Sequence, residues 1–262
     1  MLGPQHGEAG MAILTLTDAE IYYEEYGKGY PVLLFAPGGM RSRIEMWRQP
    51  ADGPARPWSD WIELLSPHYR VIAMDQRNAG RSKGAIEANH DWNTYAHDQL
   101  ALLRHLGIMS CHTLGGCIGS SYCLKLIEMD PGRTNAAVLQ NPIGLHPEFP
   151  TYFPDGFAEW TEEQVKARPE LDRAAIASFG RRMWSGDFVF SVPRDFARRC
   201  STPCLVLPGD DKPHPAVTGL ELAKLLPHNQ MLRDWKGPAH IEAQRRTVLA
   251  FLEKHTPVAE RR

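Results

Sequence analysis

A cysteine occupies a glycine-rich turn near the middle of the chain, in the run Leu114-Gly115-Gly116-Cys117-Ile118-Gly119-Ser120. An apolar run precedes this turn and apolar residues at helical spacing follow it, so the stretch predicts a strand, a sharp turn and a helix. A thiol at the apex would stand at the helix N-terminus, where the helix dipole favours the thiolate. The N–H of Ile118 would point toward a developing oxyanion. The pattern predicts Cys117 as a nucleophile, and the alternative is a small buried apolar side chain.

Strands and helices alternate around this turn along most of the chain. Residues 12–26 predict a hairpin, and a helix is expected after 59, with Ser59 as its N-cap. Apolar runs at 31–36, 71–74, 111–114, 136–139 and 204–207, with a short one near 231, predict buried strands, and 94–106, 216–226 and a segment ending near 252 predict helices. This order predicts an α/β fold with a mostly parallel, doubly wound sheet and an antiparallel edge.

The alternation breaks between residues 143 and 199, where aromatic residues and arginines are frequent. We interpret this block as a helical lid inserted over the carboxyl ends of the strands, where such sheets place their sites. Residues 11–142 and 200–262 then form the core domain, and residues 1–10 are expected to be a disordered leader.

The composition describes an ordinary globular chain of 262 residues with 43% hydrophobic residues and a formal net charge of -2. This balance gives no reason to expect nucleic acid or a membrane as partner, and we expect a small-molecule substrate. Five cysteines without ligand spacing favour reduced thiols in a cytoplasmic protein that has neither a disulfide nor a metal site. No secretory signal is visible, and a homodimer remains open.

Several motifs occur in an order that resembles the α/β-hydrolase family from about residue 11 to 254. They are the apolar strand into Pro37-Gly38-Gly39, the stretch Asp75-x-Arg77-x-x-Gly80-x-Ser82, the helix and turn up to Gly119, and Asp130-Pro131 before the strand that ends at Asn141-Pro142. The resemblance implies the α/β-hydrolase fold and the chain order nucleophile, acid, histidine. With cysteine as the nucleophile, the chain is similar to dienelactone hydrolases.

The resemblance also implies which residues complete a catalytic triad. The acid is expected after the strand that follows the lid, and we assign it to Asp211 with Asp210 as the alternative. The base is expected after the last strand, which gives His240. His214 competes for that role because it lies on the acid loop.

The loop after the strand at 31–36 is expected to supply the second oxyanion donor. By resemblance this donor is the N–H of Gly39, or that of Met40, and it acts together with the N–H of Ile118. Asp75 and Arg77 are interpreted as a structural ion pair that braces the loops beneath the site.

Met40, Arg41 and Trp184 are the expected substrate contacts. If Arg41 and Arg43 point inward they would bind a carboxylate, as a dienelactone-type substrate needs. The alternative is that these arginines are solvated at the surface.

The sequence therefore predicts a hydrolase that uses neither a metal nor an organic cofactor and cleaves a small ester, lactone or thioester through an acyl-cysteine. Two other functions remain open. One is acyl transfer or C–C bond hydrolysis on the same scaffold. The other is a catalytically silent member of the fold that binds a ligand.

Overall fold

The computed structural model describes residues 10–50, 52 and 54–260, and within them one sheet of nine strands forms the centre of the molecule. The strands are β1 (Gly10–Thr15), β2 (Ala19–Tyr26), β3 (Pro31–Phe35), β4 (Arg70–Met74), β5 (Lys83–Gly84), β6 (Cys111–Gly116), β7 (Thr134–Gln140), β8 (Cys204–Leu207) and β9 (Asn229–Met231). Their order is β1-β2-β4-β3-β6-β7-β8-β9, and β5 pairs with β2 outside this path.

The direction of the strands matches the prediction of a mostly parallel sheet with an antiparallel edge. β2 runs antiparallel to β1, β4 and β5, whereas every pair from β4–β3 to β8–β9 is parallel. The expected leader lies outside the described residues except for Gly10, which begins β1.

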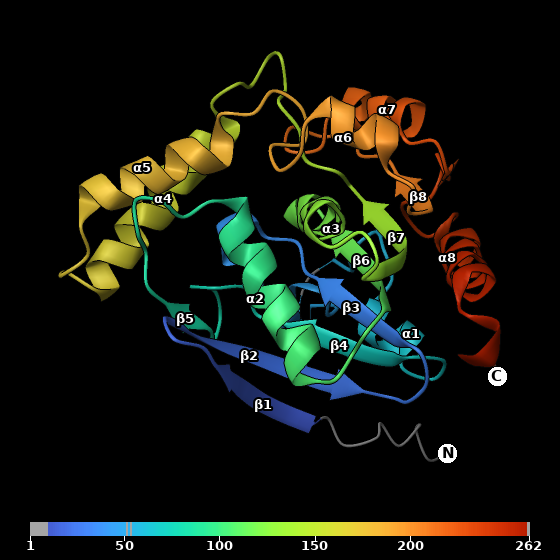
Figure 1. Cartoon of the computed structure of the whole chain (residues 1–262). Coiled ribbons are helices and arrows are strands. Elements are labelled where there is room, and N and C mark those ends of the chain that lie inside the picture. The colour runs from blue at the N-terminus through green and yellow to red at the C-terminus, as the bar shows by residue number, and fades with distance from the viewer. Residues whose placement is uncertain (1–9, 51, 53, 261–262) are drawn as a thin grey trace.

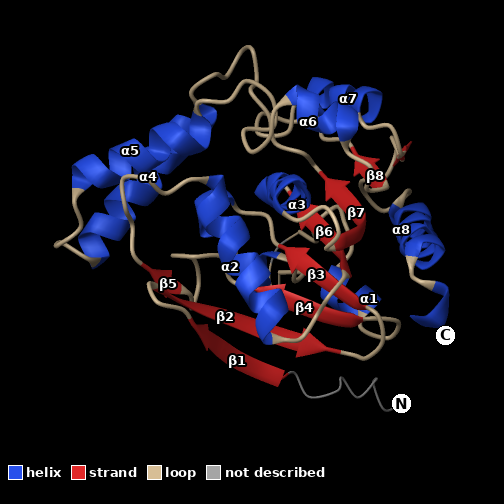
Figure 2. Ribbon diagram, viewed as in Figure 1, coloured by secondary structure: helices blue, strands red, loops and turns tan. Residues whose placement is uncertain are grey.

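Helices cover both faces of the sheet, as Figures 1 and 2 show. They are α1 (Trp61–Leu65), α2 (Trp92–His105), α3 (Ile118–Met129), α4 (Tyr152–Ala167), α5 (Arg173–Trp184), α6 (Arg194–Arg199), α7 (Ala216–Leu225) and α8 (Ile241–His255), with short 3-10 helices η1 (Gly39–Arg41), η2 (Ile44–Met46) and η3 (Val258–Glu260). Buried side chains of α2, α3 and α7 belong to one apolar cluster, and those of α1 and α8 belong to another on the opposite face.

Strand β3 shows why a continuous apolar run forms a strand here. Leu33 and Phe35 pack into the α2–α3 cluster, whereas Val32 and Leu34 pack into the α1–α8 cluster. Because successive side chains of a strand point to opposite faces, a strand covered on both faces needs apolar residues at every position. Each such side chain contributes about 1.5–3 kcal/mol when it is fully buried.

The start of α1 differs from the prediction by one residue. Asp60, rather than Ser59, is the N-cap, and its carboxylate accepts hydrogen bonds from the N–H groups of Ile62 and Glu63 at 3.0 and 3.1 Å. The hydroxyl of Ser59 is instead 3.0 Å from Oε1 of Gln244 in α8. The predicted cap was wrong because the Ser59 hydroxyl is bound to α8, and the carboxylate of Asp60 accepts the hydrogen bonds of the first turn of α1.

The segment between β7 and β8 forms α4, α5 and α6, and α4 and α5 lie side by side as a helical hairpin beyond α2 (Figure 1). Aromatic side chains hold the hairpin together, among them Phe157 against Phe179 with ring centroids 5.4 Å apart. The indole of Trp92 in α2 donates a 2.9 Å hydrogen bond to the carbonyl of Met183, which ties the hairpin to the core. No helix in the described part of the chain has the length and apolar character needed to cross a membrane.

Candidate active site

Cys117 lies at a strained turn between β6 and α3. Its backbone has φ 57° and ψ -122°, a conformation that costs an L-residue energy and is frequent at functional sites. A Cβ atom added at Gly115 would lie 2.0 Å from the carbonyl oxygen of Gly119, and one at Gly119 would lie 2.0 Å from that of Phe35. The two glycines therefore let strand, helix and neighbouring strand approach closely enough to hold the thiol at the apex.

Asp211 and His214 lie on the loop after β8 and contact each other directly. Nδ1 of His214 lies 2.5 Å from Oδ1 of Asp211, and the backbone N–H of His214 donates to the carbonyl of Asp211 at 3.0 Å. A Cβ atom at Gly209 would lie 2.2 Å from Cβ of His214, so this glycine is required for the tight loop. Bonding through Nδ1 leaves Nε2 free, and Nε2 is buried without a hydrogen-bond partner among the described residues.

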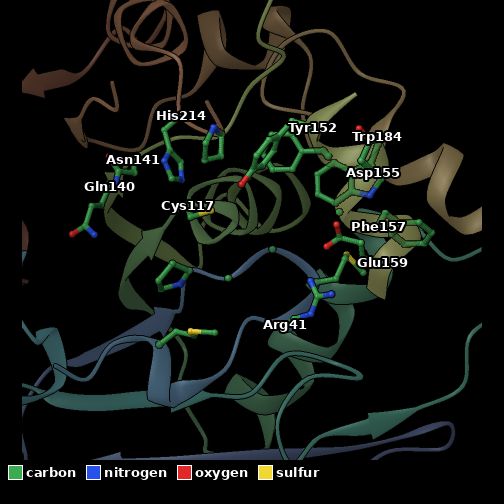
Figure 3. Close-up of a pocket in the computed structure, with 18 of the residues that line it drawn as sticks. Arg41, Cys117, Gln140, Asn141, Tyr152, Asp155, Phe157, Glu159, Trp184 and His214 are labelled. Atoms are coloured by element: carbon green, nitrogen blue, oxygen red, sulfur yellow. The ribbon is translucent and has the colours of Figure 1, made fainter. Parts of the chain in front are cut away.

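The imidazole of His214 points toward Cys117 (Figure 3), and the two groups perturb each other. Burial disfavours the charged imidazole, but the Cys117 sulfur and the Asp211 carboxylate outweigh it and raise the pKa of His214 to about 9. Burial would raise the pKa of the Cys117 thiol, but the imidazole of His214 and the backbone N–H groups of Gly38 and Ile118 lower it below its ordinary value. Both shifts favour a thiolate–imidazolium pair.

His240 occupies a different place. It is exposed at the N-cap of α8 and is not among the residues that line the cavity at Cys117. The loop before it is fixed by two contacts, since the indole of Trp235 donates to the carbonyl of Pro208 at 2.8 Å and the N–H of Gly237 donates to the carbonyl of Pro57 at 2.8 Å. The structure thus brings Cys117, His214 and Asp211 together and leaves His240 outside this group.

Asp210, the alternative acid, faces Lys236 rather than the imidazole. The ammonium of Lys236 contacts Oδ1 of Asp210 and lies 4.0 Å from Oδ2 of Asp211. The pKa of Asp211 is lowered because His214 and Lys236 outweigh the effect of burial. The loop before His240, where the base was expected, therefore contributes the cation Lys236, which contacts the loop of Asp210 and Asp211.

A cavity of about 560 Å³ opens above Cys117 (Figure 3). It is lined by Pro37, Gly38, Gly39, Met40, Arg41, Met46, Arg56, Trp58, Cys117, Gln140, Asn141, Tyr152, Phe153, Asp155, Gly156, Phe157, Glu159, Trp184, Pro213 and His214. The lining includes the expected substrate contacts Met40, Arg41 and Trp184 and the expected oxyanion residue Gly39. Ile118, the other expected donor, is fully buried behind Cys117.

The two arginines that were expected to bind a carboxylate already have acidic partners. Nε and Nη2 of Arg41 donate to both carboxylate oxygens of Glu163 in α4 at 2.9 and 2.8 Å. Arg43 is not a lining residue, and its Nε lies 3.8 Å from a carboxylate oxygen of Glu45.

Tyr152, Asn141 and Arg56 are among the lining residues that were not singled out from the sequence as site residues. Tyr152 begins α4, and its hydroxyl points toward Cys117 in Figure 3. Asn141 has a positive φ of 47° and a buried Oδ1 without a partner among the described residues. Arg56 belongs to the loop before α1. No motif marks any of the three, although Asn141 directly follows a predicted strand, where sites in parallel sheets are placed.

The predicted pairing of Asp75 with Arg77 was wrong. Arg77 is bound by Asp98 at 2.7 Å and by Asp18 at 2.7 Å. Asp75 is bound by Arg81 at 2.9 Å and accepts a hydrogen bond from the N–H of Ile44 at 2.8 Å. Each member of the expected pair has other partners, because Arg77 is bound by carboxylates of α2 and of the β1–β2 turn and Asp75 is bound by Arg81 of its own loop.

Within the described residues, no group of three or more histidine, cysteine, aspartate or glutamate side chains is arranged to hold a metal ion.

Comparison with known proteins places the chain in a family. A model of the α/β-hydrolase fold matches residues 31–179. A 2-hydroxy-6-oxo-6-(2'-aminophenyl)hexa-2,4-dienoic acid hydrolase from Metapseudomonas resinovorans is 26% identical over 91% of this chain and 89% of its own length. A Pseudomonas syringae pv. syringae (strain B728a) protein named as a carbamate hydrolase, RutD, is 34% identical over 89 residues, which span 34% of this chain and 34% of its own length.

The fold is also similar to that of solved hydrolases. The 2-hydroxy-6-oxo-6-phenylhexa-2,4-dienoate hydrolase from Rhodococcus sp. strain RHA1 superposes with a TM-score of 0.66 at 21% identity, covering 95% of this chain and 98% of that one. Since the family model matches more than half of the chain, this protein belongs to the α/β-hydrolase family and is a hydrolase.

Proposed function

We propose that this hydrolase cleaves a small ester, lactone or thioester through an acyl-cysteine intermediate, with Cys117 as nucleophile, His214 as base and Asp211 as the acid that orients it. His214 takes the role that the sequence assigned to His240. The observation that carries the proposal is the position of His214, whose Nδ1 is bound to Asp211 while its ring points toward Cys117 in the same cavity. A base held between an acid and a nucleophile is the arrangement that nucleophilic catalysis requires.

In the first half of the reaction the Cys117 thiolate attacks the substrate carbonyl carbon and a carbon–sulfur bond forms. The carbonyl oxygen becomes an oxyanion, which accepts hydrogen bonds from the N–H of Ile118 and from the Gly38-Gly39 turn. Collapse of this intermediate breaks the bond to the leaving group. The imidazolium of His214 gives its Nε2 proton to the departing oxygen or sulfur, so the charges balance.

In the second half, the now neutral His214 removes a proton from water as the water attacks the acyl-cysteine. The carbon–sulfur bond breaks, the acid product forms and the thiolate–imidazolium pair is restored. The carboxylate of Asp211 keeps Nδ1 protonated throughout, so Nε2 remains the nitrogen that exchanges protons.

C–C bond hydrolysis is the second candidate, since the relative from Metapseudomonas resinovorans, which is named a hydrolase of a dienoic acid, aligns with 91% of this chain. It would use the same nucleophile and base, and the leaving group would be a carbon acid. Product analysis separates the two functions, because ester cleavage releases an alcohol and C–C cleavage releases an enol or ketone.

The test is intact mass after brief exposure to phenyl esters, lactones and acyl thioesters, followed by peptide mapping of the adduct. We expect one acyl group on Cys117 in the wild type and none in Cys117→Ala. His214→Ala should slow acylation by a factor on the order of 100 or more, because general-base assistance is worth about that much.

His240→Ala is the matched control, since His240 is also a loop histidine but lies outside the cavity lining. Acylation that is slowed in His240→Ala and normal in His214→Ala would overturn the assignment of the base. An unmodified Cys117 with every class of substrate would overturn acyl-cysteine catalysis itself.

A further inference from the structure

We propose that Arg56 binds a carboxylate group of the substrate, so that the Cys117 site acts on esters, lactones or thioesters whose acyl chain carries a negative charge. This inference rests on the proposed function and adds the substrate class. It assigns the charge recognition to a residue outside the oxyanion loop and outside the α4–α5 hairpin.

Arg56 is held in place by its own loop. Its backbone N–H donates to Oε1 of Gln49 at 2.7 Å, and its Nε donates to the carbonyl of Arg48 at 3.0 Å. The guanidinium carbon lies 5.9 Å from the centre of the Trp58 ring. The backbone of Trp58 is held by the same loop, because its carbonyl accepts a 2.7 Å hydrogen bond from Nε2 of Gln49. A guanidinium held in this way loses little further freedom when it binds a ligand.

The two terminal nitrogens of this guanidinium remain available. Among the described residues Arg56 forms no ion pair, and its side chain donates only through Nε. The carboxylate of Asp60, which lines the second cavity with Arg56, is bound by Arg48 at 3.5 Å. Arg41, the other arginine of the cavity, is already bound through two nitrogens by Glu163. Because a guanidinium binds a carboxylate best through two parallel N–H groups, Arg56 is the cavity arginine that can still do so.

The charges of the cavity wall direct an anion toward Arg56. Asp155 and Glu159 of α4 line the cavity and form no ion pair within the described residues. Figure 3 shows them on the side of Cys117 away from Gln140. Arg56 lines the same cavity from a different part of the chain, the loop before α1. An anionic group in this cavity is therefore repelled by the two carboxylates of α4 and attracted by Arg56.

The space at Arg56 also suits an extended group. Arg56 and Trp58 line a second cavity of about 570 Å³, together with residues of α1 and of the loop before α8. Arg56 also lines the cavity at Cys117, so an acyl chain whose carbonyl lies at Cys117 can extend toward Arg56.

The test compares each of two acidic esters, phenyl hydrogen adipate and phenyl hydrogen suberate, with its own methyl ester, which has the same chain without the charge. In the wild type we expect kcat/KM for at least one acidic ester to be higher than for its methyl ester, by a factor on the order of 10 to 100. This factor corresponds to the free energy of a hydrogen bond to a charged group. In Arg56→Met this ratio should fall to about one, and Arg56→Lys should restore part of it. Arg173→Met, which removes an exposed arginine paired with Glu162 in the hairpin, should leave the ratio at its wild-type value.

A wild-type ratio near one, or a ratio that survives in Arg56→Met, would overturn the role of Arg56 while acylation of Cys117 still stands. If instead no ester acylates Cys117, the proposed catalysis fails. Calorimetric titration with adipate then decides the role of Arg56. Equal affinity for adipate in the wild type and in Arg56→Met would contradict this role. Weaker binding in Arg56→Met than in the wild type would support it.

Discussion

At the scale of single residues, the thiol of Cys117 gains its character from the groups beside it. The sulfur lies at the start of α3, near the imidazole of His214 and the backbone N–H groups of Gly38 and Ile118. Burial alone acts in the opposite direction, as the two buried thiols Cys111 and Cys123 show, because burial raises the pKa of each to about 12. Arg133 lowers the pKa of Cys111 too little to offset burial, whereas the imidazole of His214 and two backbone N–H groups together outweigh burial at Cys117.

This contrast gives a pH prediction. The rate of alkylation of Cys117 by iodoacetamide should follow a midpoint below that of an ordinary thiol, because the thiolate persists to lower pH. In His214→Asn the midpoint should move up, since burial then acts without a compensating cation. Ester turnover should also decline as the pH rises through about 9, where the imidazolium of His214 loses the proton it gives to the leaving group. Identical alkylation profiles for wild type and His214→Asn would contradict the ion pair.

At the scale of elements, strand β6, which leads into the turn at Cys117, contains the buried histidine His112. His112 is fully buried, its Nε2 lies 2.9 Å from the hydroxyl of Thr256, and its ring packs edge-on against Tyr30. Burial lowers the pKa of His112 to about 3. Because its pKa is about 6.5 in the unfolded chain, the unfolded state binds the proton first as the pH falls.

The folded state should therefore lose stability as the pH falls from about 6.5 toward 3. Between pH 7 and pH 5 the contribution of His112 amounts to about 2 kcal/mol, at 1.36 kcal/mol for each pH unit below the unfolded pKa. Urea unfolding at both pH values should show a loss smaller by this amount in His112→Gln than in the wild type. His68→Gln, at an exposed position, is the control and should retain the wild-type loss. An equal loss in both variants would show that His112 takes up a proton without unfolding.

The elements were predictable because their signals are local. Apolar runs such as those of β3 and β4 specify strands covered on both faces, and the glycines around Cys117 specify the turn that the structure contains. The N-cap of α1 was missed because Ser59 and Asp60 are both good caps, and only the tertiary contact of Ser59 with Gln244 distinguishes them.

The base of the site depends on longer-range geometry. Chain order favoured His240, whereas the position of His214 depends on the close approach of Gly209 to it and on contacts between the loops after β8 and β9. Arg56 carries no motif at all. Its exposure to the cavity results from hydrogen bonds within a loop that no periodic pattern describes.

At the scale of the whole molecule, a buried arginine joins three parts of the chain that are far apart in sequence. The guanidinium of Arg77, in the loop after β4, is bound by Asp98 of α2 and by Asp18 in the turn of the β1–β2 hairpin. The side chains of Arg77 and Asp98 are only 4% and 3% exposed, so water cannot replace a missing partner. This cluster fixes the antiparallel edge of the sheet to the helix that packs over it.

Removing one partner should therefore destabilise the fold far more than removing a surface pair does. We expect Asp98→Asn to lower the free energy of unfolding by about 3–5 kcal/mol, because the buried guanidinium loses its buried carboxylate partner and keeps only Asp18, which is partly exposed. Glu162→Gln breaks the exposed pair with Arg173, and it should cost no more than about 1 kcal/mol. Urea unfolding of both variants at neutral pH, followed by tryptophan fluorescence, measures the difference. A double variant, Asp98→Asn with Arg77→Met, should recover part of the loss, since it removes the unpaired charge as well. If the double variant is less stable than Asp98→Asn alone, the cost arises from lost packing of the long arginine side chain and not from the buried charge.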